Sequence, residues 1–174
     1  MRKAREPAKV LRRGKPEGRG KARSFPIAGI CASAGGLEAF AELLHNLPAD
    51  TGIAFVLVQH LDPTHESILS EILSKSTPVA VRQVANNTRL EPNQVYVIPP
   101  NAKMSIVKGV IKLLTGPRKA GEQHSIDHFL QSLAEERGPQ AIGVILSGSG
   151  SDGTLGLKAI KSAGGITFAQ DQTA

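Results

Sequence analysis

Residues 25–47 of the chain read FPIAGICASAGGLEAFAELLHNL. A short apolar run over 25–30 predicts a β-strand, a glycine-rich turn follows, and apolar residues then recur at helical spacing from Leu37 to Leu47. The same order returns further along the chain, with an apolar run at 53–58 and a helix candidate at 66–73. Because successive strand–helix units connect by right-handed crossovers, they predict parallel strands with helices packed on the sheet.

The middle of the chain follows another pattern, in which short strand candidates are separated by tight turns such as Lys108-Gly109. This pattern predicts antiparallel hairpins built from residues 79–84, 95–98, 104–107 and 110–114. Strand–helix alternation then returns, with Ser125 as a predicted N-cap, helices at 126–133 and 155–160, and strands at 141–146 and 166–169. The predicted fold class is α/β: a three-layer, doubly wound, mostly parallel sheet with an antiparallel hairpin edge.

Positive charge is concentrated at the N-terminus. Residues 1–24 contain ten Lys or Arg and two Glu, a net charge of +8, whereas residues 25–174 carry a net charge of −2. The first segment has little apolar surface to offset the entropy of ordering a backbone, about 1–2 kcal/mol per residue, so we expect a basic disordered tail. Such a tail could bind nucleic acid or an anionic membrane, but a solvated chain end is the favoured interpretation.

The composition excludes several classes of protein. The chain lacks the apolar segment of a signal peptide and any apolar run long enough to span a bilayer, so we expect a cytoplasmic protein without membrane insertion. Its single cysteine, Cys31, excludes internal disulfides and multi-cysteine zinc motifs. His60, Asp62 and His65 match no known metal-ligand spacing, so we expect no metal site. Aromatic residues make up 3% of the chain, which argues against a nucleic-acid partner bound by base stacking.

Polar residues follow three of the predicted strands. In an open parallel sheet, ligands bind beyond the carboxyl ends of the strands. Ser33 follows the first strand, His60 follows the second, and Asp152 lies in the segment after the strand at 141–146. A serine hydroxyl becomes a nucleophile when a histidine takes its proton, and a carboxylate stabilises the resulting imidazolium. The sequence therefore predicts Ser33 as nucleophile, His60 as general base and Asp152 as the orienting carboxylate.

Two glycine-rich turns precede helices near this predicted site. The free N–H groups and positive dipole end of a helix starting near Gly36 would face a developing oxyanion. The predicted oxyanion donors are the backbone N–H groups of Ala34 and Ser149. A competing interpretation is a phosphate or nucleotide site, since helix N-termini also bind anions, but neither turn has a complete phosphate-binding glycine motif.

Each candidate also has an ordinary structural interpretation. Ser33 could be an N-cap, His60 a strand-end histidine bonded to backbone, and Asp152 the N-cap of the helix that follows it. Their occurrence together at three strand ends favours the triad. Cys31 is interpreted as a buried packing residue in preference to a reactive thiol. The other histidines are assigned to surfaces or caps: His45, His65, His124 and His128.

Three segments carry a family resemblance: ICASAGG (30–36), VQHL (58–61) and LSGSGSDG (146–153). They resemble the three signature segments of the chemotaxis protein-glutamate methylesterases, the CheB type, in order and in approximate spacing. VYVIPP (95–100) and SID (125–127) are similar to that family's middle strand and to the start of its next helix. Several independent segments make this resemblance more specific than any one motif.

The resemblance implies that residues 25–174 form a methylesterase catalytic domain. Its activity would be hydrolysis of glutamate γ-methyl esters on the cytoplasmic domains of chemoreceptors, with release of methanol, together with deamidation of glutamine at such sites. The implied partners are the methylated receptor domains and a receptor methyltransferase, fused or separate, and the resemblance implies no cofactor. Residues 1–24 are too few for the receiver domain that precedes this domain in the family, so control by an attached receiver is not expected.

The chain departs from the family pattern at Ser149, where the family has methionine, and at Ser151, where it has asparagine. The family also continues past the position of Ala174 with a helix and a strand, so we expect the domain to be truncated there. The alternative hypothesis is a catalytically inactive domain that keeps the fold for interaction or regulation. The intact Ser33, His60 and Asp152 favour the esterase.

Overall fold

The structure of the chain is a computed structural model that describes residues 24–32, 36–59, 68–99, 102–115, 125–146 and 151–171. The predicted basic tail, apart from Ser24, lies outside these ranges. None of the helices within them has both the length and the apolar character needed to cross a membrane.

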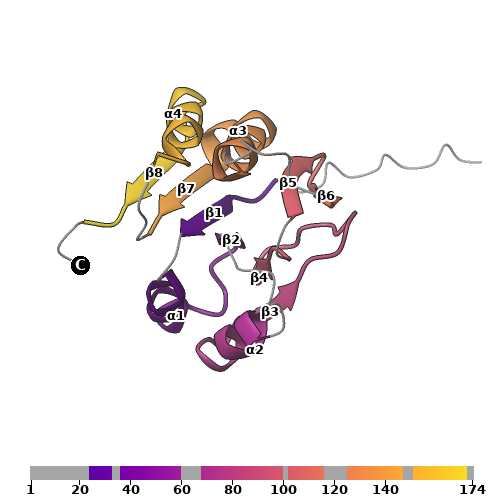
Figure 1. Cartoon of the computed structure of the whole chain (residues 1–174), viewed down its shortest axis with the longest axis vertical. Helices are drawn as coiled ribbons and strands as arrows, with labels where there is room; N and C mark the ends of the chain where they lie inside the picture. Colours follow the sequence, from indigo (N-terminus) through magenta and orange to yellow (C-terminus); the bar gives the residue numbers. More distant parts are fainter. Residues whose placement is uncertain are drawn as a thin grey trace, which may run out of the picture.

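A six-stranded sheet forms the centre of the molecule, and all of its neighbouring strands run parallel (Figure 1). In sheet order the strands are β3 (Ala80–Gln83), β4 (Gln94–Val97), β2 (Ala54–Gln59), β1 (Ile27–Ala32), β7 (Ala141–Ile145) and β8 (Ile166–Ala169). The central strands β1 and β2 are almost entirely buried, because other elements pack on both of their faces and their sequences are apolar except for Gln59 at the end of β2. The edge strands β3 and β8 are largely exposed.

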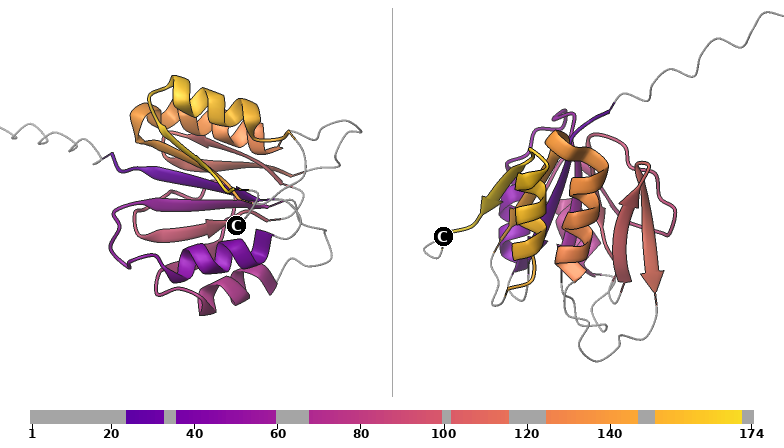
Figure 2. Two further views of the ribbon diagram at one scale, coloured as in Figure 1. Left: turned by 90° about the vertical axis from the view of Figure 1, so that its left-hand side faces the viewer. Right: turned by 90° about the horizontal axis from the view of Figure 1, so that it is seen from above.

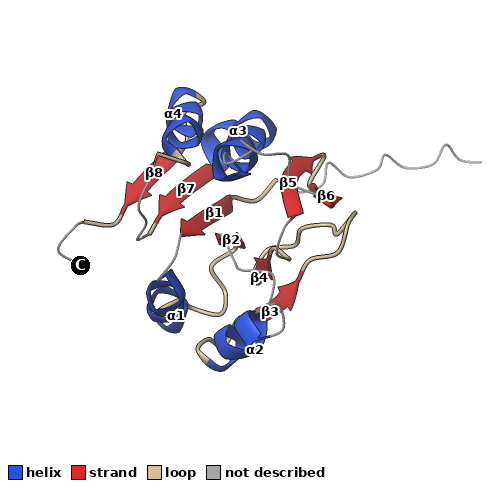
Figure 3. Cartoon of the chain, viewed as in Figure 1, coloured by secondary structure: helices blue, strands red, loops and turns tan. Residues whose placement is uncertain are grey.

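Helices on both faces give the three predicted layers (Figures 2 and 3). The helices are α1 (Gly36–His45), α2 (Ile68–Lys75), α3 (Ser125–Arg137) and α4 (Thr154–Ser162), and a 3₁₀ turn, Gly138–Gln140, follows α3. Phe40 of α1 packs on one face of the sheet, in a cluster with Ile30 of β1. Phe129 of α3 packs on the other face, in a cluster with Cys31. Successive residues of β1 therefore point to opposite cores, as in any strand.

The predicted α/β class is confirmed, but two of the predicted hairpin strands are placed differently. Among the strands that the structure describes, only β5 (Ala102–Val107) and β6 (Val110–Thr115) form an antiparallel hairpin, closed by Lys108-Gly109 with φ values of 53° and 70°. They form a two-stranded sheet of their own, which lies beside α3 on the side away from α4 (Figure 2). The strands predicted at 79–84 and 95–98 belong to the main sheet and pair parallel to each other.

The segment between β3 and β4 explains this difference. It does not form a tight turn between two antiparallel strands, because its backbone forms hydrogen bonds to the β5–β6 hairpin. Asn87 N–H donates to the carbonyl of Ile111, and Leu90 N–H donates to the carbonyl of Gly109. The segment thus acts as a crossover without a helix and brings β4 into the sheet parallel to β3.

The order of the strands reverses beside β1, because β2 lies on one side of it and β7 on the other. The chain leaves β1 toward α1 on one face, and after β7 it continues into α4 on the opposite face. Such a switch point opens a crevice at the carboxyl ends of the strands, where parallel sheets bind their ligands.

Candidate active site

The carboxyl ends of β1, β2 and β7 lie level with one another at this switch point. Ala32 and Gln59, the last residues of β1 and β2, are direct partners in the strand register. On the other side, Cys31 is the partner of Ile145, the last residue of β7. Ser33 and His60 are the next residues in the sequence after Ala32 and Gln59.

The structure describes one member of the predicted triad. Asp152 lies in the described residues between β7 and α4, whereas Ser33 and His60 lie outside them. The predicted oxyanion donors Ala34 and Ser149 also lie outside the described residues. The triad geometry therefore stays a prediction, and Asp152 is the residue whose environment can be examined.

The carboxylate of Asp152 lies at the N-terminus of α3. Its Oδ2 atom accepts a hydrogen bond from Ile126 N–H at 3.2 Å, and its Oδ1 atom accepts one from Asp127 N–H at 2.9 Å. Amides in the first turn of a helix have no acceptor within the helix, and the helix dipole is positive there. Both effects stabilise a negative charge on Asp152 and fix the orientation of its carboxylate.

Asp152 does not cap the helix that follows it, so that ordinary interpretation is wrong. The N-cap position of α4 is occupied by Gly153, with φ of 102°, and glycine has no side chain that could cap the helix. The carboxylate instead reaches a helix that begins 27 residues earlier in the chain. Residue preferences within one helix could not reveal this contact, because it joins two different elements.

Asp127 is a residue of this site to which sequence reasoning assigned no role. Its side chain is 4% exposed, and it is the one buried polar or charged side chain among the described residues. Its Oδ1 atom accepts hydrogen bonds from Gly153 N–H at 2.9 Å and Gly156 N–H at 2.8 Å, in the first turn of α4. The sequence feature that could have identified Asp127 is an acidic residue on the otherwise apolar, buried face of a predicted helix.

Cys31 lies near these two carboxylates, on the face of the sheet that α3 covers. Burial raises the pKa of its thiol far above the usual value, and the negative charges of Asp152 and Asp127 raise it further. The side chain is 0% exposed and packs with Ile126 and Phe129. The prediction of a packing cysteine is confirmed, because a thiol in this environment stays protonated and inaccessible.

The remaining histidines were assigned to surfaces or caps. His45 and His128 are exposed, as predicted, and His65 and His124 lie outside the described residues. Within the described ranges, no three His, Cys, Asp or Glu side chains are grouped so that they could hold a metal ion.

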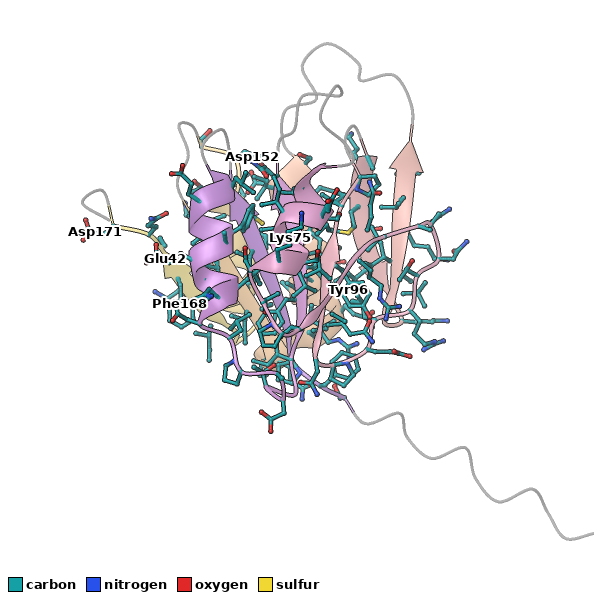
Figure 4. All side chains as sticks on the ribbon, turned by 90° about the horizontal axis from the view of Figure 1, so that it is seen from below. Glu42, Lys75, Tyr96, Asp152, Phe168 and Asp171 are labelled. Carbon is teal, nitrogen blue, oxygen red and sulfur yellow. The ribbon has the colours of Figure 1, made fainter. Side chains whose placement is uncertain are left out.

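A separate groove of about 420 Å³ lies between α1 and the strands β7 and β8. Its lining includes Leu43, Val144 and Phe168, and Phe168 is 58% exposed. Figure 4 shows Phe168 beside Glu42 along α1, apart from Asp152, which lies at one end of the molecule. The groove is on the α1 face of the sheet, whereas α3, which binds the carboxylate of Asp152, packs on the opposite face.

The family model for the CheB methylesterase matches residues 28–174 of the chain. The chain belongs to the CheB methylesterase family. The match begins in β1 and includes every helix and strand after it, so the resemblance predicted from the three signature segments is confirmed.

Individual relatives agree with the family model. The methylesterase-family chain is 34% identical to the protein-glutamate methylesterase FrzG of Myxococcus xanthus, over 97% of this chain and 49% of the relative. It is 35% identical to protein-glutamate methylesterase/protein-glutamine glutaminase 1 of Burkholderia lata, over 87% of this chain and 46% of the relative. The chain therefore spans about half the length of these curated relatives.

A solved structure has the same fold. The crystal structure of the Thermotoga maritima CheB methylesterase catalytic domain superimposes with a TM-score of 0.75 at 28% sequence identity. The superposition covers 86% of this chain and 81% of that one. The methylesterase fold is thus present from β1 to β8.

Proposed function

We propose that residues 25–174 act as the catalytic domain of a protein-glutamate methylesterase. The substrate would be the γ-methyl ester of glutamate on the cytoplasmic domains of chemoreceptors, and the products would be glutamate and methanol. The observation that carries the proposal is the position of Asp152. Two amides of α3 hold its carboxylate close enough to Cys31, near the end of β1, to act on its thiol. Ser33 follows β1 in the sequence, and His60 follows the end of β2, which is level with the end of β1. Membership of the methylesterase family supports the substrate class.

The proposed reaction uses a Ser–His–Asp triad. Ser33 Oγ attacks the ester carbon while His60 takes the hydroxyl proton, and the carboxylate of Asp152 stabilises the imidazolium. The bond between the carbonyl carbon and the methoxy oxygen then breaks, and His60 gives its proton to that oxygen. Methanol departs, and the glutamyl group remains bound to Ser33 as an acyl-enzyme. His60 next takes a proton from water as the water attacks the acyl-enzyme. The bond between the acyl carbon and Ser33 Oγ then breaks, and His60 returns the proton to Oγ, which releases glutamate and regenerates Ser33.

Capping α3 and orienting His60 are compatible roles for one carboxylate. Each carboxylate oxygen has about two acceptor positions. Each oxygen of Asp152 accepts one backbone N–H of α3. We propose that His60 is the further donor, and that the two backbone bonds keep the carboxylate in the direction that the imidazole requires.

The oxyanion of the tetrahedral intermediate would be bound by the backbone N–H groups of Ala34 and Ser149. The position of α1 supports this assignment, because α1 begins at Gly36, two residues after Ala34. Gly36 packs so closely on Ala32 that a larger residue would clash with the alanine side chain. The positive end of α1 therefore lies against the carboxyl end of β1, where it would stabilise a developing negative charge.

Glutamine deamidation is proposed as a second reaction of the same site. Attack of Ser33 on the γ-amide of glutamine follows the same steps, with ammonia as the leaving group in place of methanol. Support comes from relatives such as the Burkholderia lata protein, whose name includes a glutaminase activity. A receptor methyltransferase, fused or separate, is the proposed functional partner, since such an enzyme forms the ester that this domain would hydrolyse.

Labelling with a fluorophosphonate tests the proposed nucleophile. Such reagents phosphonylate serines that are activated by a neighbouring base. We expect one label per folded chain, located at Ser33 by peptide mass analysis, and no label on Ser33→Ala. Ser162→Ala is the matched control, because Ser162 is an exposed serine in the last turn of α4, and it should label like the wild type. A folded wild type that stays unlabelled would favour the inactive interaction domain.

A further inference from the structure

The helices α3 and α4 begin side by side, and each carries an aspartate at its start whose carboxylate bonds to the other helix. Asp152, just before α4, accepts the amides of Ile126 and Asp127 in α3. Asp127, in the first turn of α3, accepts the amides of Gly153, the N-cap of α4, and of Gly156 in the first turn of α4. We call these two aspartates the crossed pair.

We infer that Asp127 is a positioning residue for the catalytic carboxylate of Asp152. The inference rests on the proposed function, because it assigns Asp152 to the triad. Asp127 acts on Asp152 through two connections. Its side chain binds the N–H of Gly153, the residue directly after Asp152, and its own backbone N–H binds the Asp152 carboxylate.

Burial makes these bonds strong constraints. A buried carboxylate is costly unless hydrogen bonds compensate for the lost water, and Asp127 is 4% exposed. The two hydrogen bonds that its Oδ1 atom accepts from Gly153 and Gly156 are short, at 2.9 and 2.8 Å, and both are buried. Charge-assisted bonds of this kind are about twice as strong as bonds between neutral groups. The side chain of Asp127 therefore holds the backbone around Gly153 at a defined place.

Close packing between the two helices supports the same conclusion. A Cβ atom on Gly156 would lie 2.5 Å from the Cβ atom of Leu130 in α3, so the helices touch at this point. Gly153 has φ of +102°, and a Cβ atom there would lie 2.7 Å from the side chain of Ile145. The start of α4 thus has no room to shift toward α3 or toward β7. It can move only away from them, and the bonds to Asp127 oppose that movement.

The negative charges of the crossed pair are also balanced locally. Four backbone N–H groups point at the two carboxylates, and the positive dipole ends of α3 and α4 lie next to them. Both charges act on the buried thiol of Cys31, which places both carboxylates near the end of β1. Asp127 is therefore close to the proposed site without itself being assigned to touch the substrate.

Three substitutions at Asp127 separate geometry from charge. Asp127→Asn keeps an oxygen that can accept both α4 amides but removes the charge. Asp127→Glu keeps the charge but moves the oxygen by the length of one methylene group. Asp127→Ala removes the acceptor. Positioning predicts that kcat for methanol release falls about 10²-fold in the alanine and glutamate variants at nearly unchanged KM, and that the asparagine variant restores most of the activity.

Glu136→Ala is the matched control. Glu136 is another carboxylate of α3 that accepts two backbone amides, those of Lys108 and Gly109, at 2.9 and 2.8 Å. It lies in the last turns of α3, next to the β5–β6 turn and away from the crossed pair. Its removal should lower the melting temperature without changing kcat. Equal losses of kcat in both alanine variants would indicate a general loss of stability and would overturn the inference.

Hydrogen exchange of the Ile126 amide provides a readout that does not depend on activity. This amide has no acceptor within α3, and its bond is to Asp152. If Asp127 positions Asp152, exchange at Ile126 should accelerate at least tenfold in Asp127→Ala but not in Asp127→Asn or Glu136→Ala. If the wild-type protein released no methanol, the proposed function would be refuted. The exchange rates of the Ile126 amide would still show whether Asp127 positions Asp152. If the Ile126 amide stayed protected from exchange in a folded Asp127→Ala protein, the positioning role of Asp127 would be refuted. If Asp127→Ala does not fold, the same measurement is made on Asp127→Glu.

Discussion

At the scale of one residue, Cys31 is a buried core residue next to the candidate site. Its side chain is fully buried below Asp152 and Asp127, and burial and the two negative charges keep its thiol protonated. The sulfur is therefore a packing atom and takes no part in nucleophilic chemistry, although it lies two residues before the proposed nucleophile Ser33.

The folded chain should react slowly with thiol reagents. Cys31 is the single cysteine, so any modification reports on this position. Ellman's reagent should modify the native protein only through transient unfolding, even at pH 9, because the thiolate forms rarely and the sulfur is inaccessible. Addition of denaturant should release one thiol per chain at once. Rapid modification of the native protein would contradict the burial described for Cys31.

Asp152 and Asp127 also mark the limit of sequence reasoning at this scale. Asp152 was predicted because a carboxylate after a strand end completes a serine–histidine pair. The role of Asp127 was not, because its bonds to Gly153 and Gly156 join residues 26 and 29 positions apart. Spacing within one helix contains no information about an amide on another helix, so such a contact becomes visible only when α3 and α4 are placed side by side.

At the scale of elements, the contact between α3 and α4 depends on a glycine. Gly156 lies in the first turn of α4 and is buried against Leu130 of α3. In an exposed helix, replacing glycine by alanine usually stabilises the protein by about 0.5–1 kcal/mol. Here the added methyl group would overlap with Leu130, so packing and intrinsic helix preference oppose each other.

Packing should dominate at this position. We expect Gly156→Ala to lower the free energy of unfolding by about 1–3 kcal/mol, as is typical of overpacked cores. Chemical denaturation measures the change, and Lys158→Ala, an exposed position of the same helix, should stay within about 0.5 kcal/mol of the wild type. A Gly156→Ala protein more stable than the wild type would show that α3 and α4 are not in close contact there.

Elements with local signals were predicted well, whereas the pairing of β3 with β4 was not. The helix predicted at Leu37–Leu47 corresponds to α1, and the turn at Lys108-Gly109 closes the β5–β6 hairpin. The strands β3 and β4 were predicted as antiparallel because a short polar segment joins them. Their parallel pairing results from backbone bonds between that segment and the hairpin at Gly109 and Ile111, which no local pattern indicates.

At the scale of the whole molecule, the strand order brings the candidate site together. β1 lies between β2 and β7, although 81 residues separate the end of β2 from the start of β7 in the chain. The prediction that three polar strand ends meet at one edge needs only the alternation of strands and helices, because right-handed crossovers align parallel strands. The register between Ala32 and Gln59, and between Cys31 and Ile145, agrees with this expectation.

Methanol release from a methylated chemoreceptor cytoplasmic fragment is the most direct measurement of the central claim. We expect the wild-type chain to release methanol, Ser33→Ala to release none above background, and Asp152→Asn to lose about 10⁴-fold in kcat, as in other serine triads. Ser162→Ala should match the wild type, which controls for substitution of a serine as such. A folded wild type that releases no methanol, or a Ser33→Ala protein that releases it at the wild-type rate, would contradict the proposed methylesterase site.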